Sequence, residues 1–234
     1  MRLDNVGVVI PAAGQGKRMG ASLNKQFLAL RGIPLLAHTV SVFQSSDQVR
    51  EIVIVGAKDD IPVIEEIVES YRLDKVAAVP IGGAVRQESV FAGVQALSAA
   101  TQRVVVHDGA RPLLTLELFH RFLAEAEETV AAITAVPLKD TVKLVNQEGW
   151  VVETPPREQL RAVQTPQVFE RAVLEEAHRR AAQTGFIGTD DASLVEWLGY
   201  PVKVLEGSAE NIKITTPDDL WLAEKILAAR TGTK

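Results

Sequence analysis

The chain has 234 residues, of which 47% are hydrophobic and 24% are charged, a balance typical of folded globular proteins. It contains no cysteine, which excludes a disulfide scaffold, a thiolate metal site and a cysteine nucleophile. The net charge of −5 argues against a general affinity for nucleic acids, and no apolar run approaches the roughly 18 residues of a membrane span, so we expect a cytoplasmic protein.

Short aliphatic runs alternate with longer segments of helical periodicity along the first half of the chain. The runs that predict strands are Val6–Ile10, Ile52–Val55, Val76–Ile81, Val104–His107 and Ala131–Val136. The segments that predict amphipathic helices between them are Pro34–Phe43, Ile61–Tyr71, Ser89–Ser98 and Leu116–Glu127. Because strands that are apolar throughout are covered on both faces, we predict an α/β, Rossmann-like three-layer αβα fold with a mainly parallel sheet.

The pattern changes after Pro137, where alternating residues replace the fully apolar runs. Thr141–Val145 and Trp150–Glu153 flank a loop that contains Asn146 and Gly149, which predicts a β-hairpin. This hairpin forms an inserted arm at about residues 138–159, and it has no helix of its own to cover its apolar side chains. We therefore expect the arm to pack against another subunit, although packing on the main domain is the alternative.

The remainder of the chain returns to the mixed pattern. We predict a helix near Glu170–Ala182, strands at Val202–Leu205 and Ile212–Ile214, and a C-terminal helix that begins at Pro217. The sequence contains no internal repeat and no long linker, so residues 1–234 are predicted to form a single domain that carries the arm.

A glycine-rich segment, PAAGQGKRMG, follows the first predicted strand directly at residues 11–20. Glycines let backbone N–H groups approach an anion closely, and Lys17, Arg18 and Lys25 add positive charge. The spacing matches neither the dinucleotide fingerprint nor the P-loop. The segment is a candidate phosphate loop of another kind, and a tight turn with solvated basic residues is the alternative.

Two further loops follow later predicted strands. One contains Gly82, Gly83 and Arg86, with Ser89 a turn later, and the other contains Asp108 and Arg111. Ligands bind at the carboxyl ends of strands in open parallel sheets, so we expect the three loops to meet in one site.

Asp108 is the best candidate for a metal ligand. A carboxylate beside a phosphate loop can hold Mg²⁺, which binds oxygen ligands and keeps substrate phosphates in its coordination shell. Alternatively, Asp108 caps a turn or pairs with Arg111. We interpret His107, on the opposite face of the strand, as structural, and Asp190-Asp191 as either a helix cap or part of a site.

These motifs resemble those of the sugar-phosphate nucleotidyltransferases, and further ones narrow the resemblance to the methylerythritol phosphate cytidylyltransferase family. The motifs that carry it, in chain order, are PAAGxGxRM from Pro11, KQFL from Lys25, GGxxRxxS from Gly82, HDxARP from His107, Asp140-Thr141, QTPQ from Gln164, TDxA from Thr189 and NIK from Asn211. The resemblance covers essentially the whole chain, and it departs at Ala84-Val85, where the family often has an acidic pair that contacts ribose.

The resemblance implies transfer of CMP from CTP to 2-C-methyl-D-erythritol 4-phosphate, with release of pyrophosphate, by an Mg²⁺-dependent homodimer joined through the arm. It assigns nucleotide binding to Ala12, Ala13, Gly14, Gly16, Gly83, Arg86, Ser89 and Asp108, the last also as the metal ligand. It assigns the acceptor pocket to Arg111, Thr141, Arg157, Thr165 and Thr189. It assigns the catalytic cations to Arg18, Lys25, Arg157 and Lys213.

This set of cationic residues suits phosphate chemistry, because an ionised phosphate oxygen attacks without a general base while cations bring two polyanions together.

Two other functions remain open at this point. A ribitol 5-phosphate cytidylyltransferase would share the fold but usually opens with a different glycine loop. A non-catalytic nucleotide-sensing module would be expected to have lost Lys25, Asp108 or Lys213, and all three are present.

Overall fold

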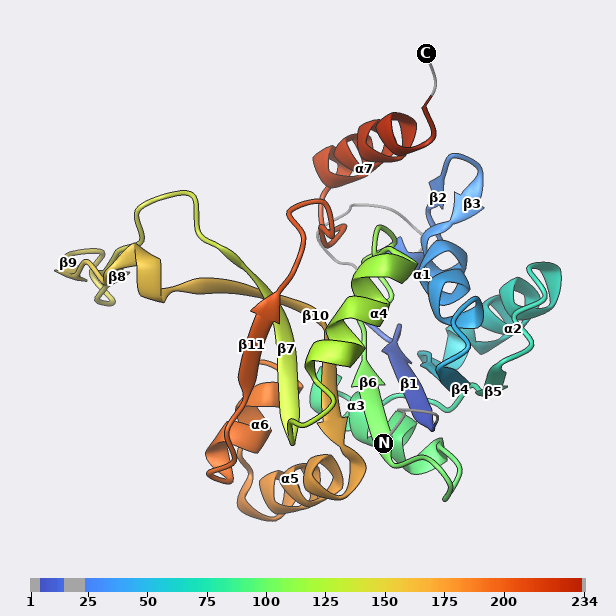
Figure 1. Cartoon of the computed structure of the whole chain (residues 1–234), viewed down its shortest axis with the longest axis horizontal. Helices are drawn as coiled ribbons and strands as arrows, with labels where there is room; N and C mark the ends of the chain where they lie inside the picture. The colour runs from blue at the N-terminus through green and yellow to red at the C-terminus, as the bar shows by residue number, and fades with distance from the viewer. Residues whose placement is uncertain (1–4, 15–23, 233–234) are drawn as a thin grey trace.

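A computed structural model describes residues 5–14 and 24–232, at whose centre lies a seven-stranded sheet of order β11-β7-β10-β6-β1-β4-β5 (Figure 1). Its strands are β1 (Val6–Pro11), β4 (Val49–Val55), β5 (Val76–Ala78), β6 (Arg103–Val106), β7 (Ala131–Pro137), β10 (Arg161–Glu170) and β11 (Lys203–Glu206). Strand β10 runs antiparallel to both of its neighbours, and the other pairs are parallel. The predicted mainly parallel sheet is therefore confirmed.

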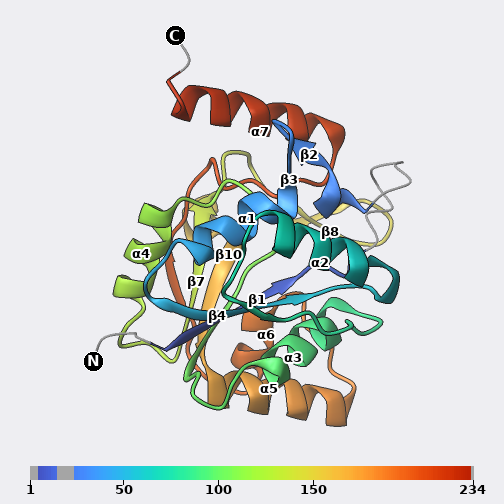
Figure 2. The same ribbon diagram turned by 90° about the vertical axis from the view of Figure 1, so that its right-hand side faces the viewer.

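Helices cover both faces of the sheet (Figure 2). The helices on one face are α1 (Leu35–Gln44), α2 (Ile61–Ser70) and α4 (Leu116–Glu125). Those on the other face are α3 (Arg86–Ala96), α5 (Arg171–Thr184) and α6 (Asp191–Trp197). Successive strand residues point to opposite faces, so Val8 joins the first apolar cluster and Val9 the second. This arrangement confirms the predicted three layers.

The C-terminal helix α7 (Pro217–Arg230) begins where the sequence predicts, but it lies outside the two main layers. It packs on the small hairpin formed by β2 (Ala29–Leu30) and β3 (Ile33–Pro34), through a third apolar cluster that includes Leu30 and Ala223. Figure 2 shows the helix at one end of the molecule.

The structure differs from the sequence predictions at several places. The β2–β3 hairpin and helix α6 are elements that the sequence patterns did not predict. The predicted strand Ile212–Ile214 is wrong: this segment is irregular, and the buried Ile214 joins the cluster beneath α7. The sequence analysis also missed β10, because Pro166 and its polar neighbours lie where a strand would be expected to be uniformly apolar. The proline is accommodated because the β10–β7 register shifts between Val163 and Gln167.

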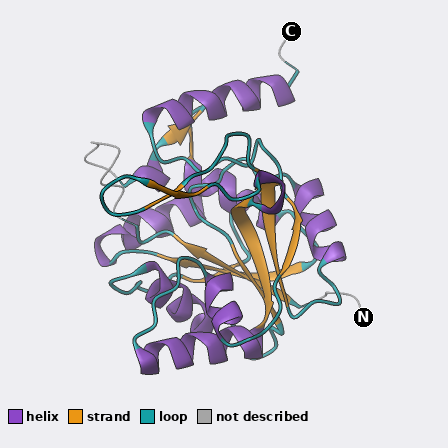
Figure 3. Ribbon diagram, turned by 90° about the vertical axis from the view of Figure 1, so that its left-hand side faces the viewer, coloured by secondary structure: helices purple, strands orange, loops and turns teal. Residues whose placement is uncertain are grey.

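The predicted arm is a two-stranded antiparallel hairpin of β8 (Leu144–Val145) and β9 (Val151–Glu153). It projects away from the central sheet in Figure 1, and in Figure 3 it points toward the viewer. Leu144 and Trp150 are 52% and 74% exposed, so within this chain the hairpin's apolar side chains are not covered. The hairpin is confirmed, and its packing on the main body, the alternative considered above, does not occur in the described chain.

Among the described residues, no helix is both long enough and apolar enough to cross a membrane.

Helix α3 contacts the sheet through Gly93, where there is no room for a side chain. A Cβ built on Gly93 would lie 2.4 Å from a methyl group of Val9 and 2.8 Å from one of Val55. Both valines are fully buried, so neither has free space to move into. This close approach fixes the N-terminal turn of α3, which carries Arg86 and Ser89.

We predict that Gly93→Ala lowers the free energy of unfolding by about 1–3 kcal/mol, because the added methyl group crowds a packed core. The direction of the change in stability tests the packing, because a glycine-to-alanine substitution in a helix without such crowding would stabilise the protein by about 1 kcal/mol. Urea unfolding followed by circular dichroism measures the change. Gln95→Ala, at an exposed position of the same helix, is the matched control and should shift stability by less than about 0.5 kcal/mol. A Gly93→Ala variant as stable as the wild type would contradict this packing.

Candidate active site

A pocket of about 540 Å³ lies at the carboxyl ends of β1, β4 and β6, beside the N-terminus of α3. Residues of the predicted nucleotide site that line it are Ala12, Ala13, Gly14, Gly83, Arg86, Ser89 and Asp108. Lys213 joins them from the segment before α7. The loops after β1, β4, β5 and β6 and the segment before α7 therefore meet at one edge of the sheet, as expected for a ligand site in an open α/β fold.

One wall of the pocket depends on a glycine. A Cβ on Gly82 would lie 2.6 Å from the Ser89 hydroxyl oxygen and 2.8 Å from the Ala13 Cβ. The buried Ser89 hydroxyl donates a hydrogen bond to the Val85 carbonyl oxygen at 3.2 Å. A side chain at position 82 would therefore displace the Ser89 hydroxyl or the loop that carries Ala13.

The glycine-rich loop is described only at its two ends. Gly14 lines the pocket, whereas Gly16 and Arg18 lie outside the described residues, and for Lys25 the structure describes the backbone in a short 3-10 helix, Lys25–Phe27. The Gln26 amide donates to the Ala12 carbonyl oxygen. This contact fixes the chain that returns from the loop against the end of β1.

Asp108 is the centre of the site's electrostatics. Its carboxylate lies 2.8 Å from Lys213 Nζ, 3.4 Å from Arg86 Nε and 3.7 Å from Arg111 Nε. Burial by itself raises the pKa of a carboxyl group, but the charges of Arg86, Lys213 and Arg111 outweigh it and hold the pKa of Asp108 far below its ordinary value. Asp108 therefore remains an anion at any pH at which the protein works.

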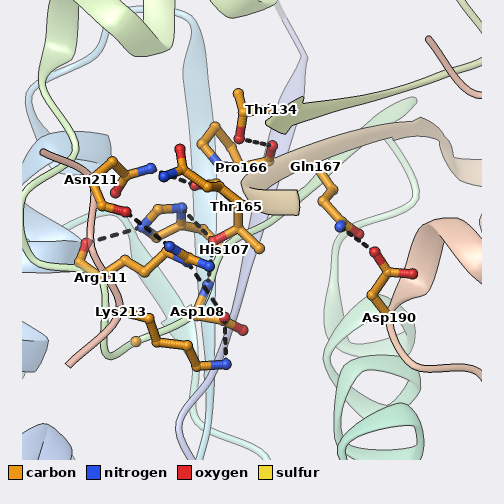
Figure 4. Close-up of polar contacts among 12 residues, drawn as sticks. His107, Asp108, Arg111, Thr134, Thr165, Pro166, Gln167, Asp190, Asn211 and Lys213 are labelled. Atoms are coloured by element: carbon orange, nitrogen blue, oxygen red, sulfur yellow. Dashed lines mark hydrogen bonds and ion pairs between the residues drawn. The ribbon is translucent and has the colours of Figure 1, made fainter. Parts of the chain in front are cut away.

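Arg111 and Asn211 connect this carboxylate to neighbouring segments (Figure 4). The Arg111 guanidinium donates to the Asn211 carbonyl oxygen at 2.8 Å, and the Asn211 side chain donates to the Thr165 carbonyl oxygen at 2.8 Å. Both Arg111 and Asn211 are buried. These bonds hold the segment that carries Lys213 against β10, so the lysine reaches Asp108 from a fixed position.

His107 supports the same carboxylate from behind. Burial lowers its pKa to about 4, so the ring is neutral near pH 7. Its Nε2 lies 3.2 Å from the Arg111 carbonyl oxygen, which only accepts, and the proton is therefore on Nε2. Nδ1 then accepts from the Thr165 hydroxyl at 3.1 Å, and that hydroxyl accepts from the Asp108 N–H at 3.1 Å. Thr165, predicted to contact the acceptor, has its hydroxyl proton committed to His107 here.

The other predicted acceptor residues lie apart from the pocket. Arg157 and Thr141 belong to the exposed arm, where Arg157 donates to the Lys139 carbonyl oxygen at 2.7 Å. Thr189 is exposed just before α6. None of these three residues lines the pocket of this chain. Among the described residues, the sequence analysis also missed Lys58, which lines the pocket and carries no recognisable motif.

The described residues contain no group of three His, Asp or Glu side chains that would hold a metal ion by themselves. Among the described residues that line the pocket, Asp108 is the one with a carboxylate side chain. A single carboxylate fits Mg²⁺ where ligand phosphates complete the coordination shell, which is the usual arrangement for this ion. The donor set therefore suits a metal that arrives with a nucleotide rather than a permanently bound one.

Comparisons with known proteins point to a single family. The family model described as 2-C-methyl-D-erythritol 4-phosphate cytidylyltransferase (IspD) matches residues 6–229. The protein of that name from Halalkalibacterium halodurans is 52% identical over 223 residues, which cover 95% of this chain and 97% of that protein. Its namesake from Alkaliphilus metalliredigens is 47% identical over 226 residues, 96% of this chain and 94% of the other.

Solved structures show the same likeness. The 4-diphosphocytidyl-2C-methyl-D-erythritol synthase from Anaerococcus prevotii superposes with a TM-score of 0.85 at 33% identity, covering 96% of each chain. The 2-C-methyl-D-erythritol 4-phosphate cytidylyltransferase from Thermus thermophilus gives a TM-score of 0.77 at 38% identity, covering 95% of this chain and 98% of that one. With the family model matching nearly its full length, the chain belongs to the 2-C-methyl-D-erythritol 4-phosphate cytidylyltransferase family.

Proposed function

We propose that this chain transfers CMP from CTP to 2-C-methyl-D-erythritol 4-phosphate in isoprenoid biosynthesis. An oxygen of the acceptor's phosphate attacks the α-phosphorus of CTP, and the bond between that phosphorus and the bridging oxygen to the β-phosphate breaks. The products are 4-diphosphocytidyl-2-C-methyl-D-erythritol and pyrophosphate. Membership of the family supports the reaction, and we place it in the cytoplasm, where CTP is available.

The observation that carries the proposal is the group of three cations around Asp108. Two polyanions repel each other, so the main task of the site is to bring them together in line. Lys213 lines the pocket, and the buried Arg111 lies behind it, 3.7 Å from the Asp108 carboxylate. We assign both to attracting the acceptor's phosphate. The nucleophile is ionised before it binds, which is consistent with a site whose nearest histidine, His107, is neutral and bonded on both ring nitrogens.

The nucleotide fits the opposite side of the pocket. One wall of the pocket offers backbone groups of Ala12, Ala13 and Gly83. Gly82 lets the segments of this wall lie close together, and the Ser89 hydroxyl lies next to Gly82. Backbone donors and acceptors fixed in this way can recognise the edge of a small base without charged side chains. We assign the cytosine to this wall and the triphosphate to the glycine-rich loop, with Arg18 and Lys25 stabilising its charge.

We propose that Asp108 holds Mg²⁺ together with the phosphates of CTP. When bound, the ion neutralises phosphate charge and fixes the triphosphate geometry. For the chain itself, this role requires Asp108 to be anionic and partly released by its cations. The low pKa of Asp108, which Arg86, Lys213 and Arg111 maintain against the effect of burial, meets the first condition.

We predict that Lys213→Ala lowers kcat/KM for pyrophosphate release by about 10²–10³, because it removes one pre-positioned cation from the reacting phosphates. Pyrophosphate release with Mg²⁺, CTP and methylerythritol phosphate measures this. Lys203→Ala is the matched control: Lys203 is exposed on β11 and contacts the Glu125 carbonyl oxygen, away from the pocket. Normal turnover by Lys213→Ala, or an equal loss in Lys203→Ala, would contradict the assignment.

We propose that the protein is a homodimer in which each arm reaches the partner's active site. The arm leaves Leu144, Trp150 and Val151 more than half exposed, an apolar surface that a second subunit would cover. It also carries Arg157 and Thr141 away from the pocket of their own chain. Contact with the partner accounts for both observations.

This dimer predicts complementation between two inactive variants, Arg157→Ala and Lys213→Ala. A mixed dimer has one site with both residues intact, so a random mixture should recover about a quarter of the wild-type activity. The control pairs Arg157→Ala with the double variant that lacks both side chains, a mixture that should stay inactive. Sedimentation of the same samples reports dimerisation. Mixed dimers without recovered activity would show that the arm does not serve the partner's site.

A further inference from the structure

Behind the pocket wall lies a buried acid–histidine pair that the mechanism above does not use. Asp191 is the first residue of α6 and His178 lies in α5, and each is 1% exposed. Their nearest atoms, Asp191 Oδ1 and His178 Nε2, are 3.4 Å apart. Neither residue lines the pocket. Any effect of the pair on the reaction must therefore pass through a residue that lines the pocket.

Arg86 is that residue. Its Nη1 lies 2.7 Å from Asp191 Oδ2, whereas its Nε lies 3.4 Å from Asp108 Oδ1. The guanidinium thus spans two carboxylates and makes its shorter contact with the one outside the pocket. Burial would lower the pKa of Arg86, but Asp191 and then Asp108 raise it above its ordinary value. Arg86 is therefore a permanent cation, and it interacts more strongly with Asp191 than with Asp108.

The position of Asp191 is fixed by the packing of its neighbours. The Asp190 side chain caps α6 by accepting from the Ser193 N–H at 2.9 Å, which fixes the first turn of the helix. The His178 ring stacks on Phe91 of α3, with centroids 5.3 Å apart and planes 7° from parallel. Helices α3, α5 and α6 thus meet at this pair. Its position relative to Arg86 follows from the packing of three helices, not from a flexible loop.

The contact of Arg86 with two carboxylates affects the Asp108 carboxylate. A guanidinium free to pair with Asp108 alone would take both carboxylate oxygens in a bidentate contact, the stronger geometry for an arginine and a carboxylate. Those oxygens would then be less available to a nucleotide-bound cation. The short contact with Asp191 restrains Arg86, so only Nε faces Asp108, at the longer distance.

We propose that Asp191, supported by His178, is a positioning residue that restrains Arg86 and keeps the Asp108 carboxylate available to Mg²⁺·CTP. The proposal rests on the function proposed above and extends it to two residues that touch no substrate. It predicts that loss of the Asp191 charge weakens nucleotide binding through Arg86 and has little effect on the chemical step.

A double-mutant cycle tests this coupling, with Mg²⁺·CTP binding measured by calorimetry and turnover by pyrophosphate release. Asp191→Asn should weaken Mg²⁺·CTP binding about tenfold or more, the loss typical of a hydrogen bond between charged groups, while kcat stays within about twofold. In an Arg86→Ala background the same substitution should weaken binding no further. Asp190→Asn is the matched control, because asparagine also caps helices and Asp190 contacts Gln167, not Arg86.

A second variant covers the case in which Asp191→Asn folds poorly. His178→Phe keeps the ring that stacks on Phe91 but removes the nitrogen next to Asp191, and it should weaken binding in the same direction by a smaller factor. Unchanged binding in both variants, or equal losses with and without Arg86, would overturn the proposal. A wild-type protein that binds Mg²⁺·CTP but releases no pyrophosphate would instead contradict the proposed function, and the binding cycle would still decide the role of Asp191.

Discussion

A buried carboxylate surrounded by three cations is the interaction on which this site depends. Asp108 is 8% exposed, and an isolated charge at that depth is very unfavourable. Arg86, Arg111 and Lys213 compensate it, and they come from the start of α3, the loop after β6 and the segment before α7. Arg86 also pairs with Asp191, whereas Lys213 and Arg111 pair with Asp108. The charge of Asp108 is therefore fully compensated only when all three segments are in place.

The fold meets that requirement at the carboxyl edge of its sheet. His107 and Asp108 directly follow strand β6. Gly93 lets α3 approach the sheet closely enough for Arg86 to reach the Asp108 carboxylate. The antiparallel β10 adds Thr165, which links the Asp108 backbone to His107. Asp108, Arg86 and Arg111 thus each have a partner outside the pocket: Thr165, Asp191 and Asn211. These partners hold the two arginines in position before any phosphate arrives.

The parts that sequence reasoning predicted follow from local patterns. Runs such as Ile52–Val55 predicted buried parallel strands, and glycines, arginines and Asp108 after such strands predicted a phosphate site. Strand β10 escaped because Gln164, Thr165 and Gln167 are buried polar residues whose partners lie on distant segments. Ile212–Ile214 was misassigned because a short apolar run looks the same whether it pairs in a sheet or packs beneath a helix. The link between Asp191 and Arg86 joins residues 105 positions apart, and no local pattern contains it.

The cations around Asp108 are proposed to serve transfer of CMP to a methylerythritol phosphate. The most direct measurement is pyrophosphate release from CTP and Mg²⁺ with 2-C-methyl-D-erythritol 4-phosphate or ribitol 5-phosphate as the acceptor, each with and without a chelator. The account predicts release with the first acceptor alone and none once the metal is removed. Release with ribitol 5-phosphate alone, or none with either acceptor despite CTP binding, would contradict it.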